Sequence, residues 1–466
     1  MNSTLSNIHV NKLAKYNYKY IDSNGDVYIG TKEGRLTKYI SPVSTTTVVD
    51  NTTTTNNTAI VTNEFAFSDS ANLDAFSRLR ISTPTTLFSS QFTYNLNTLL
   101  FEQITNGSGA TITHNSTDRN ALLTFSSTPT GGKAYMQSYE YIPYQPSKSQ
   151  LIFITFNMIE DMPDVVKFAG LSDGNNGIEF QNIGTAYQFT IYSDTTLGDE
   201  TVVQDDWNLD KLDGTGFSGI SLDLTTTQIL VIDFQALYVG RVRVGFDIDG
   251  QIVYCHEFLH ANAALYPYIQ TANLPIRCGM TSTATVSTTM NFICCAVVSE
   301  GGTESSNLFG YDFIQRSDAI TVGTGGAHVL SIRPKTTFNS ITNRIKTILT
   351  GIELFNSGNQ PVLWELCLGQ AISGTTTFND INTTYSSMQY NFLGTLSGSP
   401  TIIIDGGWLP ASGSSKVSVG ESINSRYPIT LDAAGAVRSL GTVTIKMTSL
   451  SGSQTCYAAL KFKEIR

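Results

Sequence analysis

The sequence predicts an all-β protein of tandem antiparallel β-sandwiches behind a small N-terminal anchoring segment. Only 14% of the 466 residues are charged, whereas about 25% is usual in soluble domains. Thr, Ser, Asn, Gln and Gly must therefore form most of the polar surface, and these residues suit strand faces and turns better than exposed helices. Short alternating apolar runs also recur between turn-forming clusters, with little helical periodicity, as in a sandwich or jelly roll.

Residues 1–63 form the predicted N-terminal segment. Short β-like pieces occupy residues 1 to about 40, with a turn signal at Asp22–Asp26. Residues 44–58 are a Thr- and Asn-rich stretch that cannot form a core of its own. An anchor on a tether and a merely irregular terminus both fit this pattern.

The rest of the chain is predicted to contain two sandwiches. Residues 64–300 form the first, residues 301–307 read as a linker, and residues 308–466 form the second. Clear strand candidates in the first are Ser149–Met158, Tyr187–Tyr192, Gln228–Phe234 and Val242–Phe246. Those in the second are Val329–Arg333, Val362–Leu368, Thr401–Ile404 and Val443–Met447.

The composition also limits the classes of function that this chain can have. The formal net charge is −10 and no dense basic run occurs, which disfavours nucleic acid or an anionic membrane as the main partner. No signal peptide or apolar run of about 18 residues is seen, so synthesis and folding in a cytoplasm are expected. The six cysteines show no metal-ligand spacing, and we expect buried free thiols and no cofactor.

One string has the spacing of a catalytic motif. His256-Glu257-Phe258-Leu259-His260 matches zinc peptidases, in which a helix brings both histidines onto one face. Along a strand the two side chains are instead roughly 13 Å apart. A hairpin signal at Asp249-Gly250 predicts a strand here, with Ile252, Tyr254, His256 and Phe258 on one face.

A helix remains the alternative for this string, because Phe258, Ala261 and Leu265 have helical spacing. The other parts of a zinc site are missing, since no Glu occurs between Glu257 and Glu300. A zinc hydrolase is therefore the least favoured function, and His256 and His260 are rejected as metal ligands.

Three further groups resemble sites, and each has a structural explanation that we favour. Tyr135, Tyr139 and Tyr141 share one face of an extended stretch and could stack on sugar rings, although such rows more often fill a sandwich core. Asp173, Asn175 and Glu179 alternate like calcium ligands, but a β-turn explains them better.

The third group is acidic and surrounds Trp207. Paired carboxylates are what glycoside hydrolysis requires, whereas a solvated loop is the more common setting for such residues. The group comprises Asp205, Asp206, Asp210 and Asp213. We expect no catalytic residues in this chain.

Two blocks, Asp74–Phe88 and Gln204–Gly250, carry a resemblance to a known family. They resemble a module of virion structural proteins of tailed bacteriophages and large DNA viruses, over roughly residues 64–300 and more weakly around Val329–Lys335. The resemblance implies a concanavalin-like or jelly-roll module in a virus particle, with no catalytic residues to carry over. It also implies a strand after a hairpin at residues 250–262.

The expected function is thus a non-enzymatic virion component, a tail or head-fibre protein that forms part of the particle or attaches it to a host. Its partners would be capsid, portal, neck or tail proteins, other copies of itself in a homo-oligomer, and a host-surface glycan. A capsid decoration or neck protein is the alternative within this class. A carbohydrate-binding adhesin or depolymerase is the alternative from another class.

Overall fold

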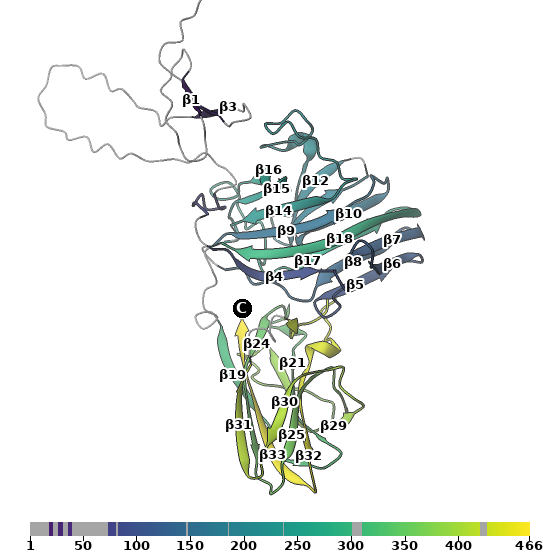
Figure 1. Cartoon of the computed structure of the whole chain (residues 1–466), viewed down its shortest axis with the longest axis vertical. Helices are drawn as coiled ribbons and strands as arrows, with labels where there is room; N and C mark the ends of the chain where they lie inside the picture. Colours follow the sequence, from purple (N-terminus) through teal and green to yellow (C-terminus); the bar gives the residue numbers. More distant parts are fainter. Residues whose placement is uncertain are drawn as a thin grey trace, which may run out of the picture. The chain divides into compact units, whose positions relative to one another are not determined.

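The computed structural model describes residues 73–80, 83–145, 148–184, 186–235, 237–300, 310–419 and 426–466, and three strands between residues 18 and 39. These residues lie almost wholly in antiparallel strands and loops (Figure 1), with two short 3₁₀ turns, η1 (Gln204–Asp206) and η2 (Ser439–Gly441). In this part of the chain, no helix is long and apolar enough to cross a membrane.

The chain divides into two compact units, Met1–Ser70 and Ala71–Arg466. In the first, three antiparallel strands form a sheet in chain order: β1 (Tyr18–Ile21), β2 (Val27–Gly30) and β3 (Leu36–Tyr39). The β-like pieces predicted for this segment therefore form a meander. The predicted tether at residues 44–58 and the predicted linker at 301–307 lie outside the described residues.

The first sandwich of the larger unit has two antiparallel sheets. The seven-stranded sheet has the order β13 (Glu200–Val203), β12 (Tyr187–Tyr192), β11 (Gly177–Asn182), β10 (Val165–Ser172), β17 (Ile276–Ser282), β8 (Lys133–Ser138) and β5 (Phe101–Asn106). The eight-stranded sheet has the order β16 (Gln251–Phe258), β15 (Val242–Ile248), β14 (Gln228–Phe234), β9 (Gln150–Asn157), β18 (Val286–Ser299), β7 (Asn120–Thr128) and β6 (Ala110–Asn115), and β4 (Thr85–Gln91) pairs with β18.

One hydrophobic core joins these two sheets. Alternate residues of each strand point into it, and edge-to-face aromatic contacts hold its centre. The Phe292 ring lies 4.9 Å from that of Phe92 and 5.7 Å from that of Phe101. Trp207 joins the core from the η1 loop, with its ring 4.8 Å from Phe189.

The second sandwich has a core of its own. Its five-stranded sheet has the order β19 (Tyr311–Arg316), β33 (Gln454–Ile465), β24 (Lys346–Asn356) and β31 (Gly413–Ser418), with β20 (Ile320–Val322) also paired to β33. The six-stranded sheet has the order β27 (Asn379–Asp380), β28 (Met388–Asn391), β21 (Ala327–Pro334), β32 (Val443–Ser449), β25 (Val362–Leu368) and β30 (Ile402–Leu409).

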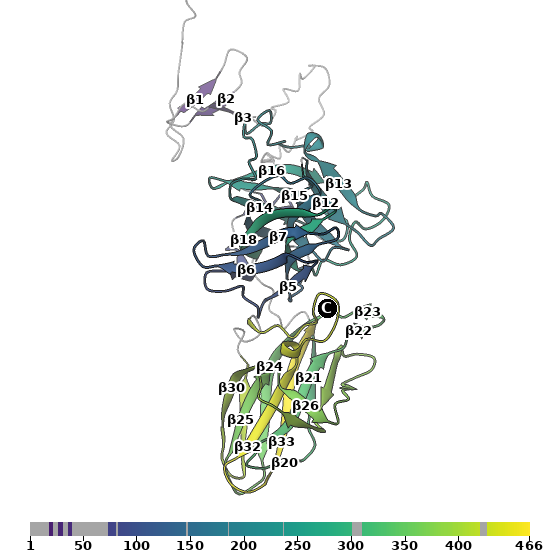
Figure 2. The same ribbon diagram turned by 90° about the vertical axis from the view of Figure 1, so that its right-hand side faces the viewer.

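Two small ribbons complete this sandwich, β22 (Thr337–Phe338) with β23 (Ile341–Thr342), and β26 (Ala371–Gly374) with β29 (Gly394–Ser397). Figure 2 shows β25, β30 and β32 of the six-stranded sheet side by side. The predicted class, an all-β fold with tandem antiparallel sandwiches, is confirmed.

The hairpin between β15 and β16 forms as predicted, but one detail of it was wrong. Asp249 and Gly250 both have positive φ, 53° and 79°, as a tight two-residue turn requires. A β-bulge then shifts the register of β16, so that His256 pairs with Val244 while Tyr254 pairs with the next residue, Gly245. The extra residue, Cys255, interrupts the alternation of side chains between the two faces of the strand. Tyr254 therefore lies on the opposite face from His256, not on the same face as predicted.

All six cysteines are free thiols. Five are buried and Cys294 is half-buried. Burial raises the pKa of each buried thiol, which keeps it protonated and unreactive near neutral pH. They act as small apolar side chains.

Candidate functional site

The motif histidines do not share a helix. His256 lies in strand β16, and His260 lies two residues beyond its end. The Phe258 ring packs against both imidazoles, with centroid distances of 4.5 Å to His256 and 6.5 Å to His260. The predicted strand is confirmed for His256–Phe258, and Leu259 and His260 follow it in a loop.

Both imidazole rings have hydrogen-bond partners within the protein. Nδ1 of His256 accepts from the backbone N–H of Asn208 at 3.2 Å, and burial lowers the pKa of His256. The buried ring of His260 has Glu200 Oε2 at 3.0 Å from Nε2 and the Gly240 carbonyl at 3.1 Å from Nδ1. Within the described residues, no group of three or more His, Cys, Asp or Glu side chains could hold a metal ion.

The predicted calcium candidates lie around the β10–β11 hairpin. Oδ1 of Asp173 accepts the backbone N–H groups of Asn175 and Asn176 at 3.0 and 2.9 Å, which is turn capping. Glu179 is buried on the outer face of β11, where a guanidinium nitrogen of Arg277 lies 3.6 Å away. Arg277 thus supplies the positive charge beside Glu179.

Of the three tyrosines, Tyr135 and Tyr139 are only half-buried and do not fill the core, contrary to the favoured interpretation, whereas Tyr141 is buried. Ala134 and Met136 of β8 point into the core, so Tyr135 points outward. A guanidinium group lies over each ring, Arg277 over Tyr135 at 4.3 Å, Arg438 over Tyr139 at 3.5 Å and Arg344 over Tyr141 at 4.3 Å. Burial raises the pKa of Tyr141 to about 12. One face of each ring is therefore already covered.

The acidic group around Trp207 also has structural roles. Asp205 and Asp206 are in the 3₁₀ turn η1. Asp210 is buried and accepts the backbone N–H groups of Leu212 and Ser218. The Thr215 hydroxyl and N–H donate to Asp213, which holds the pKa of that carboxyl below its usual value. These carboxylates hold the loop in shape through hydrogen bonds, and the indole of Trp207 anchors the loop to the core.

An ion cluster that the sequence analysis missed lies on the outer face of the eight-stranded sheet. Asp233 of β14 and Arg243 of β15 are both fully buried, and Arg243 Nη2 lies 2.5 Å from Asp233 Oδ2. Arg80 approaches the same oxygen at 2.5 Å and contacts Glu300 at 2.8 Å. Tyr254 adds a hydroxyl donor at 2.9 Å, and burial raises its pKa. Two cations thus face two anions.

The segment Leu73–Arg80, which we call the strap, is fixed to the sheet by this cluster. Arg243 donates to the Leu73 carbonyl at 2.6 Å, and Arg80 Nε donates to the same carbonyl at 3.0 Å. Buried charges are tolerated only when paired and hydrogen-bonded, and each charge here has such partners. The cluster is therefore a fastening between chain segments.

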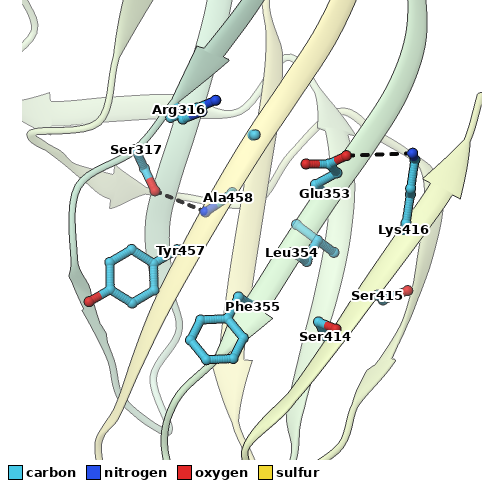
Figure 3. A pocket seen from close by; sticks show the side chains of 11 residues that line it. Arg316, Ser317, Glu353, Leu354, Phe355, Ser414, Ser415, Lys416, Tyr457 and Ala458 are labelled. Atoms are coloured by element: carbon cyan, nitrogen blue, oxygen red, sulfur yellow. Dashed lines mark hydrogen bonds and ion pairs between the residues drawn. The ribbon is translucent and has the colours of Figure 1, made fainter.

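A groove of about 470 Å³ lies on the outer face of the five-stranded sheet of the second sandwich (Figure 3). Its side chains come from β19, β24, β31 and β33. The lining residues are Arg316, Ser317, Glu353, Leu354, Phe355, Ser414, Ser415, Lys416, Tyr457, Ala458 and Ala459. None of these residues was predicted from the sequence.

The strand register explains how the groove forms. Ala459 of β33 pairs with Arg316 on one side and Glu353 on the other, and Glu353 pairs with Lys416. In the next row, Tyr457 pairs with Phe355, which pairs with Ser414. The small Ala459 side chain leaves a hollow between larger neighbours.

Fold and sites together define a tandem β-sandwich protein with a buried ion cluster in the first sandwich and an open aromatic groove on the second. No protein-family model and no curated protein matches the chain. Among solved structures it is similar to a β-glucanase of Bacillus licheniformis, with 14% identity over 47% of this chain and 98% of that chain and a TM-score of 0.28.

Two further solved structures are similar at the same level. The winged bean acidic lectin complexed with methyl-α-D-galactose is 12% identical over 46% of this chain and 98% of its own, with a TM-score of 0.29. The botulinum neurotoxin serotype G binding domain is 9% identical over 66% of this chain and 65% of its own, with a TM-score of 0.30. Likeness at this level says nothing about activity.

Proposed function

We propose that this chain is a non-enzymatic structural component of a virus particle, of the tail- or head-fibre type. The observation that supports the proposal is the contact between Arg80 and Asp233. Arg80 belongs to the Asp74–Phe88 block and Asp233 to the Gln204–Gly250 block, the two stretches that resemble virion proteins. The resembling blocks meet in the fold at a buried ion cluster.

The chemistry of that cluster favours a scaffold role. Asp233 receives hydrogen bonds from Arg80, Arg243 and Tyr254, and it is completely shielded from water. A carboxylate held in this way cannot serve as a base or nucleophile for an external substrate. It can fasten the strap across the sheet, which suits a structural component.

The experiment is to locate the chain in particles. Virus particles would be purified by density gradient from cells that produce this chain, then examined by mass spectrometry and immunogold electron microscopy. We expect the chain at many copies per particle, with label on tails or head fibres. Label on the capsid surface or neck would favour the decoration or neck alternative, and absence from particles would overturn the proposal.

The N-terminal unit is the proposed attachment point. A variant lacking residues 1–63 should remain a folded protein, because the larger unit begins at Ala71. We expect this variant to be lost from particles while the full-length chain is incorporated. Equal incorporation of both would contradict the anchor role without affecting the particle assignment.

A further inference from the structure

The groove on the five-stranded sheet combines an aromatic platform with unbalanced positive charge. The rings of Tyr457 and Phe355 stack with centroids 5.9 Å apart and an interplanar angle of 29°. Their side chains are 38% and 43% exposed, although large aromatic side chains are usually buried. An exposed, ordered ring pair offers a flat apolar surface to a ligand.

The charges around the hollow do not cancel. Glu353 is paired with Lys461 at 2.5 Å and lies 3.7 Å from Lys416. The hydrogen bond from Lys461 holds the pKa of Glu353 below its usual value, so this carboxylate is ionised. Arg316 is exposed; its carbonyl accepts a hydrogen bond from Gln315 Nε2 at 2.7 Å, whereas its guanidinium has no hydrogen-bond or ion-pair partner among the described residues. Among the lining residues, two cations, Arg316 and Lys416, therefore accompany one anion, Glu353, in a chain whose net charge is −10.

We propose that this groove binds an acidic saccharide, a sugar ring that carries a carboxylate. The apolar face of the ring would stack on Tyr457 and Phe355, and its carboxylate would accept from Arg316 across the hollow above Ala459. A guanidinium recognises a carboxylate through two parallel hydrogen bonds. The exposed hydroxyl of Ser414 belongs to a lining residue and suits a sugar hydroxyl.

This inference does not depend on the virion assignment, because sugar binding is measured on the purified chain alone. Two sources share the proposed chemistry, sialic acids and uronic acids. We would therefore measure binding of 3′-sialyllactose and of trigalacturonic acid to the full-length protein by calorimetry and saturation-transfer NMR. The methyl ester of each sugar is the matched control, because it removes the negative charge and keeps the sugar rings and their hydroxyls.

We expect at least one acid to bind, with its methyl ester about tenfold weaker or more, as the loss of a charge-assisted hydrogen bond predicts. Which acid binds identifies the source. Tyr457→Ala and Arg316→Ala should each weaken binding about tenfold or more. Trp408→Ala, an exposed aromatic of β30, and Arg119→Ala, an exposed arginine of the first sandwich, should leave it unchanged.

Three results would overturn the proposal. The first is that neither acid binds below about 10 mM. The second is that binding is equal for acid and ester, or unaffected by Arg316→Ala and Tyr457→Ala in variants that are folded by circular dichroism. The third is that the protein binds neither acidic sugar but forms an oligomer that dissociates in the Tyr457→Ala variant. This result would assign the face to contact with a second copy of the chain.

Discussion

Arg80 and Asp233 are 153 residues apart in the sequence, and their side chains form an ion pair with an Nη2–Oδ2 distance of 2.5 Å. The same oxygen of Asp233 also accepts from Arg243, whose side chain is completely buried. One carboxylate therefore contacts two guanidinium groups, of which Arg80 has a second anionic partner in Glu300. Removal of the Asp233 carboxylate would leave the completely buried Arg243 without its anionic partner.

We expect Asp233→Ala to lower the free energy of unfolding by about 3–5 kcal/mol, the usual effect of removing one partner from a buried ion pair. Urea denaturation at pH 7, followed by circular dichroism, measures this change. A decrease below about 1 kcal/mol would show that Arg243 and Arg80 find other partners, and the cluster would not be the fastening described above.

The strap provides a matched pair of arginines for a control. Arg78 is 51% exposed and pairs with Asp74 four residues away, whereas Arg80 is 13% exposed and pairs across the sheet. We expect Arg78→Ala to cost about 0.5 kcal/mol or less, as surface ion pairs do, and Arg80→Ala several times more. Equal decreases in the free energy of unfolding for Arg78→Ala and Arg80→Ala would contradict this distinction between a surface ion pair and a buried one.

The buried side chain of Lys167 should make the free energy of unfolding depend on pH in the alkaline range. Lys167 donates to the carbonyls of Met158, Glu160 and Thr289, and burial lowers its pKa from 10.5 to about 8. Between these values the unfolded chain binds more protons than the folded chain. The contribution of Lys167 to the free energy of unfolding therefore rises with pH, by at most about 1.4 kcal/mol per unit.

The measurement compares wild type with Lys167→Met from pH 7 to 10.5. Other groups, the buried thiols and tyrosines among them, titrate in both proteins and largely cancel in the difference. We expect the free energy of unfolding of wild type minus that of the variant to increase above pH 8. A difference that is constant over this range would show that the pKa of Lys167 is not lowered.

Much of the fold was predictable because its signals are local. The mostly apolar run Gln228–Phe234 and the alternating run Val242–Phe246 form strands β14 and β15 as predicted. The turn at Asp249-Gly250 was predictable from two residues that tolerate positive φ. The bulge at Cys255 was not, because only the register against Val244 and Gly245 reveals an extra residue.

The sites depend on contacts between distant segments, which local patterns do not encode. The groove joins Arg316, Glu353 and Tyr457 from three strands, and the ion cluster joins Arg80 to Asp233. One local signal existed for the groove. Tyr457 and Phe355 occupy the outward positions of their strands, two residues from Ala459 and from the charged Glu353. An aromatic residue on the polar side of a strand indicates an exposed ring.

The positions of the motif histidines lead to a prediction about zinc. Both imidazoles already have hydrogen-bond partners, and His260 lies beyond the end of the strand that holds His256. We expect purified protein to contain less than one zinc per chain by elemental analysis. EDTA should leave the melting temperature unchanged within about 1 °C, because a ligand that does not bind the folded state cannot stabilise it. Stoichiometric zinc that disappears in His256→Ala would contradict this expectation.

The last prediction concerns Glu179 and Arg277, which lie together on the outer face of the seven-stranded sheet. Burial raises the pKa of Glu179, while the Arg277 guanidinium partly opposes that rise. Because the folded state holds the proton more tightly, the contribution of Glu179 to stability falls as pH rises above 4.5. Arg277→Met keeps an unbranched side chain but removes the guanidinium, which supplies the counter-charge and lies over the rings of Tyr135 and Phe168. At pH 7 we expect Arg277→Met to lower the free energy of unfolding by about 3 kcal/mol.

In the background of Glu179→Gln, which has no charge to neutralise, Arg277→Met should lower the free energy of unfolding much less. A double-mutant cycle by urea denaturation measures the coupling between the two side chains. Additive effects would mean that Arg277 stabilises the sheet only through its packing on the aromatic rings.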